Sequence, residues 1–228
     1  MVLRGICSKA THGLVAALSS AFAGDLAFES VGGVDAVLRL ENGEVFDLVV
    51  LAEEAVAKQL SAGRLVGESR VIGISEVAIA VPAGAARVDI RSTALLRQAL
   101  LGAARIGFST GPSGVALVRL IERWGLAESL QGRLVQSRPG VPVAAMLAAG
   151  QADLGFQQLS ELRGQPGIEL LGLMPPGEEI VTRFLGAVGA GSAQHAAARD
   201  ALEFMASPAQ DAIRQAQGMA TERTCRQR

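Results

Sequence analysis

Short apolar runs alternate with helical stretches along the whole chain, and this alternation limits the folds that it can adopt. The runs are VLRGIC, LAFESV, FDLVVLA, VAIAVP, RIGFS, GRLVQS, ADLGFQQ, IELLGL and RFLGAVGA. Strands separated by helices are typical of proteins whose sheets are largely parallel. The sequence therefore predicts the α/β fold class.

One unit of this alternation occurs twice. The stretch GVDAVLRLENGEVFDLVVL begins at Gly33, and GVPVAAMLAAGQADLGFQQL begins at Gly140. Each has Gly-Val, a short helix, a leucine seven residues after the first glycine, a second glycine ten residues after it, and then Asp-Leu opening a strand. The second glycine is a signal for the end of a helix. Either this spacing of glycine, leucine and aspartate is common to any α/β unit, or the chain contains two similar lobes.

The loops that precede the two copies favour two lobes. CSKATHG stands before the first copy and FSTGPSG before the second, and each is small, rich in hydroxyl groups and placed between a strand and a helix. Each lobe would then offer two strand–loop–helix junctions. Helix N-termini carry unpaired N–H groups and a partial positive charge, which favour anions. Four junctions facing a cleft would bind an oxyanion or a carboxylate without a cluster of cations.

Composition excludes several other classes of function. The formal charge of −1 leaves no basic stripe for a nucleic acid. No stretch approaches the ~20 apolar residues of a membrane-spanning helix. Cys7 and Cys225 have no metal-ligand or disulfide spacing, and two histidines far apart offer little for a zinc site or a Ser-His-Asp triad. We expect neither a metal nor another cofactor.

Several motifs, in their order, resemble the type II periplasmic binding proteins, specifically the molybdate-binding branch and its uncharacterised relatives. They are SVGGVDA, GEVFDLVVLAEEAVAKQLSAG, IGFSTGPSGVALVRLIERWG and GQADLGFQQLSELRGQPGIELLGLMP. The resemblance covers nearly the whole chain. It implies two lobes joined by crossing strands, each a mostly parallel sheet flanked by helices, with the ligand cleft between them. Lobe 1 would comprise residues 1–79 and 185–228, and lobe 2 residues 80–184.

The opening MVLRGICSKATHGLVAALSSAFAG has two interpretations. As a secretion signal, it has a basic start at Arg4 and Lys9, an apolar run at residues 14–22 and a cleavage site after AFA. As structure, VLRGICS is a buried strand and residues 13–23 form an amphipathic helix. The resemblance favours the second interpretation, because the first strand and its loop carry ligand contacts in this family. We expect a cytoplasmic protein without an export signal, or a periplasmic one if the start is mis-assigned.

Residues at the four junctions are the candidates for ligand contact. In the first loop, the compact ammonium group of Lys9 suits a carboxylate or a phosphate, although a lone lysine is also a typical solvated residue. His12, next to it, would contact the ligand or simply begin a helix. In the first and third loops, the resemblance implies contacts with the ligand. At the second and fourth junctions and at Gln158, the candidates follow from the backbone chemistry of glycine or from the chemistry of the side chain. The predicted contacts are Ser8, Lys9, Thr11, Gly32, Gly33, Val34, Ser109, Thr110, Ser113, Gly114, Arg138, Gly140, Val141 and Gln158.

The second and fourth junctions carry specific expectations. Gly32 and Gly33 would let a ligand approach the backbone closely, and here the chain departs from the molybdate binders, which usually place serine hydroxyls in this loop. In the fourth junction, Arg138 would form a forked pair with a carboxylate or remain solvated, while Gly140 and Val141 would supply N–H groups. Pro142 fits the first helical turn. Ser113, in the third junction, also fits a helix cap.

Two glutamines and a glutamate follow the strand ADLGF. Gln157 and Gln158 stand where the molybdate branch commonly has tyrosine, and an amide suits an organic acid better than a bare tetrahedral oxyanion. Glu161 would act as a base for proton transfer, or would begin a helix together with Ser160.

Three functions are compatible with these features. The first is a soluble binding protein, related to those of ABC transporters, that closes its lobes around a small anion. The second is an isomerase that shifts a proton on an unsaturated carboxylic acid, as aconitate isomerases do, with Lys9, His12 or Glu161 moving the proton. The third is a ligand-sensing effector protein. Fold alone does not choose among them, because function depends on the site.

Overall fold

The computed structural model describes residues 2–138 and 140–221 and divides the chain into two compact units. Unit 1 is Met1–Ser75 with Thr182–Arg228, and unit 2 is Glu76–Val181. Strands β4 (Leu65–Pro82) and β9 (Val181–Gly189) each continue from one unit into the other. The boundaries that the sequence suggested, after residues 79 and 184, fall on these same two strands.

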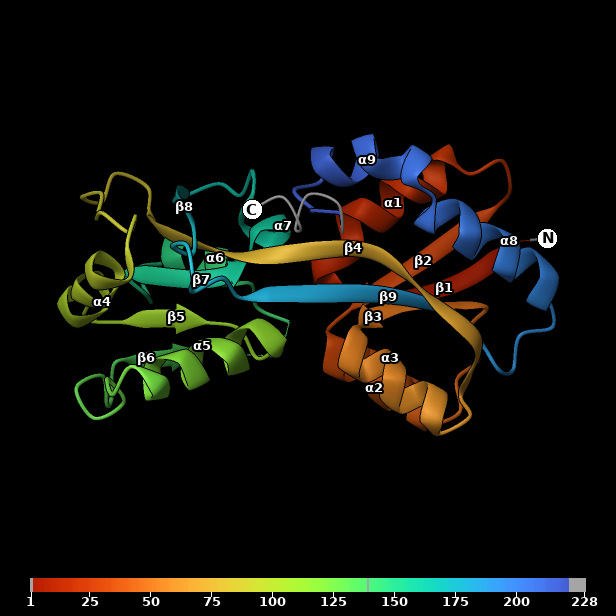
Figure 1. The fold of residues 1–228 in the computed structure, drawn as a ribbon, viewed down its shortest axis with the longest axis horizontal. Helices are drawn as coiled ribbons and strands as arrows, with labels where there is room; N and C mark the ends of the chain where they lie inside the picture. The colour runs from red at the N-terminus through yellow and green to blue at the C-terminus, as the bar shows by residue number, and fades with distance from the viewer. Residues whose placement is uncertain (1, 139, 222–228) are drawn as a thin grey trace. The chain divides into compact units, whose positions relative to one another are not determined.

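Unit 1 is a sheet covered by helices on both faces (Figure 1). Its strands run in the order β2, β1, β3, β9 and then the first part of β4, and β1 pairs in parallel with both β2 and β3. Apolar side chains of α1, α8 and α9 pack on one face, and those of α2 and α3 on the other. The bounds are β1 Leu3–Ser8, η1 Lys9–Thr11, α1 His12–Ala21, β2 Leu26–Val31, α2 Gly33–Glu41, β3 Leu48–Ala52, α3 Glu53–Ser61, α8 His195–Ala206, η2 Pro208–Gln210 and α9 Asp211–Ala216.

Unit 2 repeats this plan. The rest of β4 is followed by β7, β5 and β6, with β5 parallel to both β6 and β7, and β8 pairs with the other edge of β4. Helices α4 and α5 pack on one face, and α6 and α7 on the other. The bounds are α4 Thr93–Gly102, β5 Ile106–Phe108, α5 Pro112–Arg123, β6 Leu134–Gln136, α6 Val143–Ala148, β7 Leu154–Gln158, α7 Leu159–Leu162 and β8 Ile168–Leu173. No helix in the described part of the chain has the length and apolar character that crossing a membrane requires.

Each of the nine apolar runs forms a strand, so the predicted α/β class is confirmed. The main difference is β4, which begins at Leu65, well before the predicted run at Val77. Its first part, LVGESRVIGISE, contains two glycines and three charged residues, and only Leu65, Ile72 and Ile74 among its apolar residues are buried. This part lies next to β9, whose backbone hydrogen bonds hold an extended strand whatever its side chains are.

The duplicated sequence corresponds to a duplicated local structure. Gly43 has a φ of 83° and donates its N–H to the carbonyl of Leu40 at 3.1 Å. Gly150 has a φ of 65° and donates to the carbonyl of Leu147 at 3.0 Å. Left-handed glycine is the usual way to end a helix, because it has no Cβ to clash. The predicted helix-ending glycines are therefore confirmed in both units.

The aspartate that opens the following strand also acts alike in both units. Asp47 accepts the backbone N–H of Arg4 on its Oδ2 at 2.8 Å, and its own N–H donates to the carbonyl of Arg4 at 2.7 Å. Asp153 accepts the N–H of Arg105 at 2.9 Å and donates to the carbonyl of Arg105 at 2.9 Å. Each pair ties the beginnings of two neighbouring parallel strands together, so the strands end together at the opposite edge.

Candidate functional site

In unit 1 the ends of β1 and β2 bring two predicted junctions side by side. Ser8, the last residue of β1, is in register with Val31, the last residue of β2. A Cβ atom placed on Gly33, just beyond β2, would lie 4.0 Å from the Cβ of Ser8. The first and second candidate loops therefore lie side by side.

The first junction is built around two buried hydroxyl groups. Ser8 is 7% exposed and Thr11 is fully buried. The hydroxyl of Thr11 donates to the carbonyl of Ser8 at 2.9 Å, and the two hydroxyl oxygens are 3.4 Å apart. Lys9 and His12 are exposed beside them. The loop thus holds the Ser8 hydroxyl in a fixed place within a tight turn, with the cationic side chain at its surface.

Cys7 precedes this junction but is not a nucleophile in the folded chain. Its side chain is fully buried, and burial raises the pKa of the thiol to about 11, although hydrogen bonds with Thr11 and Ser30 lower that pKa in part. A thiol with this pKa is protonated at neutral pH, whereas the thiolate is the reactive form. Cys225 lies outside the described residues.

The second junction is a helix start without a side-chain cap. Helix α2 begins at Gly33, and the residue before it, Gly32, has no side chain to accept an N–H. A Cβ atom on Gly32 would lie 2.7 Å from Oδ2 of Asp35, so that carboxylate occupies the Gly32 side of the turn. The side chain of Val34 is 62% exposed. The Gly33 side, which faces Ser8, is open.

The carboxyl ends of the parallel strands in unit 2 are equally aligned. Phe108 at the end of β5 is in register with Phe156 on β7 and with Gln136 at the end of β6. The residues that follow, Ser109 and Ser137 among them, therefore leave the sheet at one edge. The N–H of Ser137 donates to the carbonyl of Phe108 at 2.8 Å, which holds these two loops together.

The third junction contains a buried pair of serines. Ser109 is 9% exposed and Ser113 is 4% exposed, and their hydroxyl oxygens are 2.9 Å apart. A Cβ atom on Gly114 would lie 1.8 Å from the carbonyl oxygen of Ser109, so only glycine fits there. Helix α5 begins at Pro112, so Ser113 lies inside the first turn and bonds to Ser109; its interpretation as the capping residue is wrong. Thr110 is exposed at the surface of the loop.

The fourth junction differs from the expectation. The N–H of Val141 donates to the carbonyl of Arg138 at 3.0 Å, so it closes a turn instead of pointing outward as predicted. Pro142 is the residue before helix α6, not its first residue, because its ψ of 149° is extended. Arg138 and Gly140 are exposed, and Gly140 has a φ of 80°.

The first N–H group of α6, that of Val143, is not available to a ligand because the side chain of Gln157 accepts it. The N–H of Val143 donates to Oε1 of Gln157 at 2.8 Å, and Nε2 of Gln157 donates to Oε1 of Glu161 at 2.8 Å. Because a backbone N–H can only donate, the orientation of the Gln157 amide is fixed and its NH₂ group must face the carboxylate. Gln157 is 3% exposed and Glu161 is partly buried. The chain of bonds holds the Glu161 carboxylate in place at the end of β7.

Two further polar residues stand at this edge. Gln158 is 3% exposed, and strand alternation places it on the same face of β7 as Leu154 and Phe156, the face that α4 and α5 cover. Ser137 is 5% exposed and was not among the predicted contacts. The signal that could have found it is a hydroxyl at or just after the carboxyl end of a strand, as with Ser8 and Ser109.

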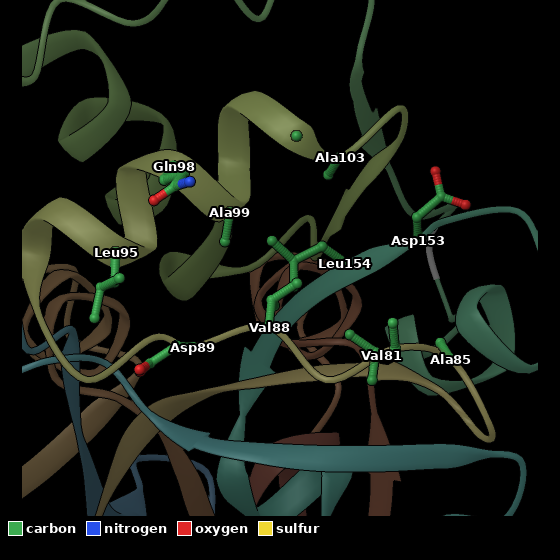
Figure 2. Close-up of a pocket in the computed structure, with 12 residues that line it drawn as sticks. Val81, Ala85, Val88, Asp89, Leu95, Gln98, Ala99, Ala103, Asp153 and Leu154 are labelled. Atoms are coloured by element: carbon green, nitrogen blue, oxygen red, sulfur yellow. The ribbon is translucent and has the colours of Figure 1, made fainter.

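A separate pocket of about 630 Å³ lies within unit 2 (Figure 2). Its wall is mostly apolar and comes from β4, the loop after it, α4 and the beginning of β7. Its two carboxylates, on Asp89 and Asp153, pair with Arg91 at 2.6 Å and Arg105 at 3.0 Å. The pocket contains none of the predicted contacts, and Leu154 places it at the opposite end of β7 from Gln158. We therefore assign the candidate site to the loops and not to this pocket.

Metal binding has no support in residues 2–138 and 140–221, where no three His, Cys, Asp or Glu side chains are grouped as ligands. The loops instead supply hydroxyl groups and backbone N–H groups at the carboxyl ends of the parallel strands of each unit. Ser8, Thr11 and Gly33 lie together in unit 1, and Ser109 and Ser113 in unit 2. Contacts between these residues and a ligand remain predictions.

The family follows from a match over nearly the whole chain. Residues 9–220 match the family model described as bacterial extracellular solute-binding protein. The chain belongs to this family. The fold is also that of the periplasmic molybdate-binding protein of Azotobacter vinelandii, with a TM-score of 0.80 at 20% identity over 96% of this chain and 99% of that one. The predicted type II periplasmic binding protein fold is thereby confirmed.

Two relatives are similar in sequence. An aconitate isomerase from Pseudomonas sp. is 37% identical over 171 residues, which is 74% of this chain and 65% of the relative. A molybdate-binding protein of Azotobacter vinelandii is 26% identical over 126 residues, which is 54% of this chain and 50% of the relative. The matches thus cover about two thirds and one half of the lengths of these curated relatives.

The Gln157 contacts predict a stability effect. Gln157→Leu removes the acceptor of the buried Val143 N–H and the donor to Glu161, and we expect it to lower the free energy of unfolding by about 1–3 kcal/mol. Urea denaturation measures this change. The matched control is Gln98→Leu, at an exposed position on α4, which we expect to leave stability within about 0.5 kcal/mol. Equal stabilities of the two variants would contradict a structural role for Gln157.

Proposed function

We propose that this chain binds a small organic acid through the loops at the carboxyl ends of the parallel strands in both units, and that its two units close on the ligand. The observation that carries the proposal is the pairing, in each unit, of a buried serine hydroxyl with the start of a helix. In unit 1, Ser8 lies beside the uncapped start of α2; in unit 2, Ser109 and Ser113 lie at the start of α5. Hydroxyl and N–H donors of this kind suit carboxylate oxygens.

Three features favour an organic acid over a bare tetrahedral oxyanion. The aconitate isomerase is similar over a larger share of this chain, and at higher identity, than the molybdate-binding protein. Apolar side chains also stand at the candidate loops, where Val34 is 62% exposed and Val141 is 39% exposed. A carbon skeleton would cover such apolar surface, whereas molybdate or sulfate would not. The amide of Gln158 offers both a donor and an acceptor to the same kind of ligand.

The proposal predicts a ligand-dependent rise in melting temperature. A panel of cis-aconitate, trans-aconitate, citrate, molybdate and sulfate is tested at about a hundred times the dissociation constant, where binding adds roughly 2.7 kcal/mol and raises the Tm by roughly 5–10 °C. We expect Ser8→Ala and Ser109→Ala to weaken binding of the responding acid about tenfold, because each loses a hydrogen bond to a charged group. Ser61→Ala, at an exposed position on α3, is the control.

Either of two results would overturn the assignment. Unchanged affinity in both serine variants would remove the loops from the binding site. A Tm response to molybdate or sulfate but to none of the organic acids would replace the proposed ligand class.

A second function, isomerisation of the bound acid, is favoured by the Gln157–Glu161 contact. An allylic proton shift on an unsaturated acid needs a base that removes a proton from the carbon next to the double bond. It also needs a group that returns a proton to the carbon at the other end of the allylic system. Glu161 has its carboxylate held at 2.8 Å by the Gln157 amide, which is the fixed geometry that a general base requires. Hydroxyl and N–H donors at the loops would stabilise the negative charge that develops. The similarity to an aconitate isomerase supports this second proposal.

The second proposal predicts exchange of carbon-bound hydrogen. In deuterated water, the wild-type protein should exchange a carbon-bound hydrogen of trans-aconitate for deuterium. Proton NMR measures this exchange as the loss of the corresponding signal. We expect Glu161→Gln to lower this exchange at least about a hundredfold while affinity changes by only about a few-fold, because a base acts in the reaction more than in binding. Glu128→Gln, at an exposed position, is the matched control, and Lys9→Ala and His12→Ala test the other two candidates. Tight binding with no exchange in the wild type would leave a binding protein only.

A further inference from the structure

Nearly every glycine in the chain has a structural reason to be glycine. Some have a positive φ, as Gly43 and Gly150 do. Others would place a Cβ atom 3.0 Å or less from a neighbouring atom, as Gly114 does. At Gly13 and Gly32 the close atom is the end of a flexible side chain, of Gln217 and Asp35, which can move aside. Among the glycines of residues 2–138 and 140–221, three have neither a positive φ nor an atom that close: Gly33, Gly102 and Gly111.

Two of these three stand beside the buried serines of the candidate loops, one in each unit. A Cβ atom on Gly33 would lie 4.0 Å from the Cβ of Ser8, and a Cβ atom on Gly111 would lie 3.8 Å from the hydroxyl oxygen of Ser109. Both distances are ordinary van der Waals contacts, so the fold leaves room for a methyl group at either place. The third glycine, Gly102, ends α4 and has nothing within 4 Å of the corresponding point.

Glycine at these two positions brings no evident benefit to the folded chain. Gly33 is the first residue of α2, where the flexibility of glycine in the unfolded chain makes it less favourable than alanine. Gly111 precedes α5 with φ −82° and ψ −174°, an extended conformation that any residue adopts. Serine is at least as good as glycine before a helix. The fold would therefore accept a side chain at either position, so the open space next to Ser8 and Ser109 calls for another explanation.

We propose that Gly33 and Gly111 determine the size of ligand that the site accepts. The absent side chains leave space beside the side chain of Ser8 and beside the hydroxyl group of Ser109, so a ligand that bonds to either serine extends into this space. A compact tetrahedral oxyanion has no need of it, whereas a di- or tricarboxylic acid fills it with its carbon skeleton or a further carboxylate. The inference rests on the proposed function and narrows its ligand to that class.

The test compares three glycine variants in one assay. Dissociation constants for trans-aconitate and citrate are measured by calorimetry for Gly33→Ala, Gly111→Ala and the control Gly102→Ala, together with each Tm without ligand. We expect the first two to bind about tenfold or more weakly, because an added methyl group overlaps the ligand, with the Tm of Gly33→Ala equal to or above that of the wild type. Gly102→Ala should bind as the wild type does. If Gly111→Ala melts early, Gly111→Ser replaces it and keeps a good residue before the helix.

The outcomes separate this inference from the function on which it rests. Weaker binding by the Gly33 and Gly111 variants, but not by the Gly102 variant, supports it. Wild-type affinity in both site variants overturns the size-determining role and leaves the proposed acid-binding function standing. A wild-type protein that binds molybdate or sulfate but neither organic acid overturns both.

Discussion

The structure depends first on the contact that ties the beginnings of neighbouring parallel strands together. In unit 1 the carboxylate and N–H of Asp47 hold the backbone of Arg4, and in unit 2 Asp153 holds Arg105 in the same way. A shift of one residue between such strands would turn every buried side chain to the wrong face. With the beginnings tied, the carboxyl ends meet at one edge of each sheet. The loops that follow are therefore gathered without any help from a ligand.

Because the loops are brought together, their hydroxyl and N–H groups can form a polar site although the loops carry few charged side chains. Buried hydroxyl groups are costly unless they are hydrogen-bonded, and here they bond to one another or to a turn carbonyl, as Ser109 does with Ser113 and Thr11 with Ser8. Gly114 holds the third loop tightly against α5, because no other residue fits beside the Ser109 carbonyl. The donors are thus fixed in position before a ligand arrives, which lowers the entropy cost of binding.

Local patterns allowed much of this to be predicted. Apolar runs identified each of the nine strands among the described residues, and the spacing of Gly43 and Gly150 located two helix ends, since both signals act over a few neighbouring residues. The features that escaped prediction arise from tertiary contacts. The Oε1 of Gln157 accepts the N–H of Val143, fourteen residues away in sequence, and no local pattern reveals that bond. The first part of β4 is held by its neighbour β9 and not by its own composition.

Binding of the ligand by the loops at the carboxyl ends of the parallel strands in both units can be tested by amide hydrogen exchange. Exchange is measured with and without saturating trans-aconitate. If these loops bind the ligand, exchange should slow in residues 8–13 and 33–36 of unit 1 and in residues 109–115 of unit 2, with no change in residues 84–103 around the pocket of Figure 2. Slower exchange confined to residues 84–103 would instead place the binding site in that pocket.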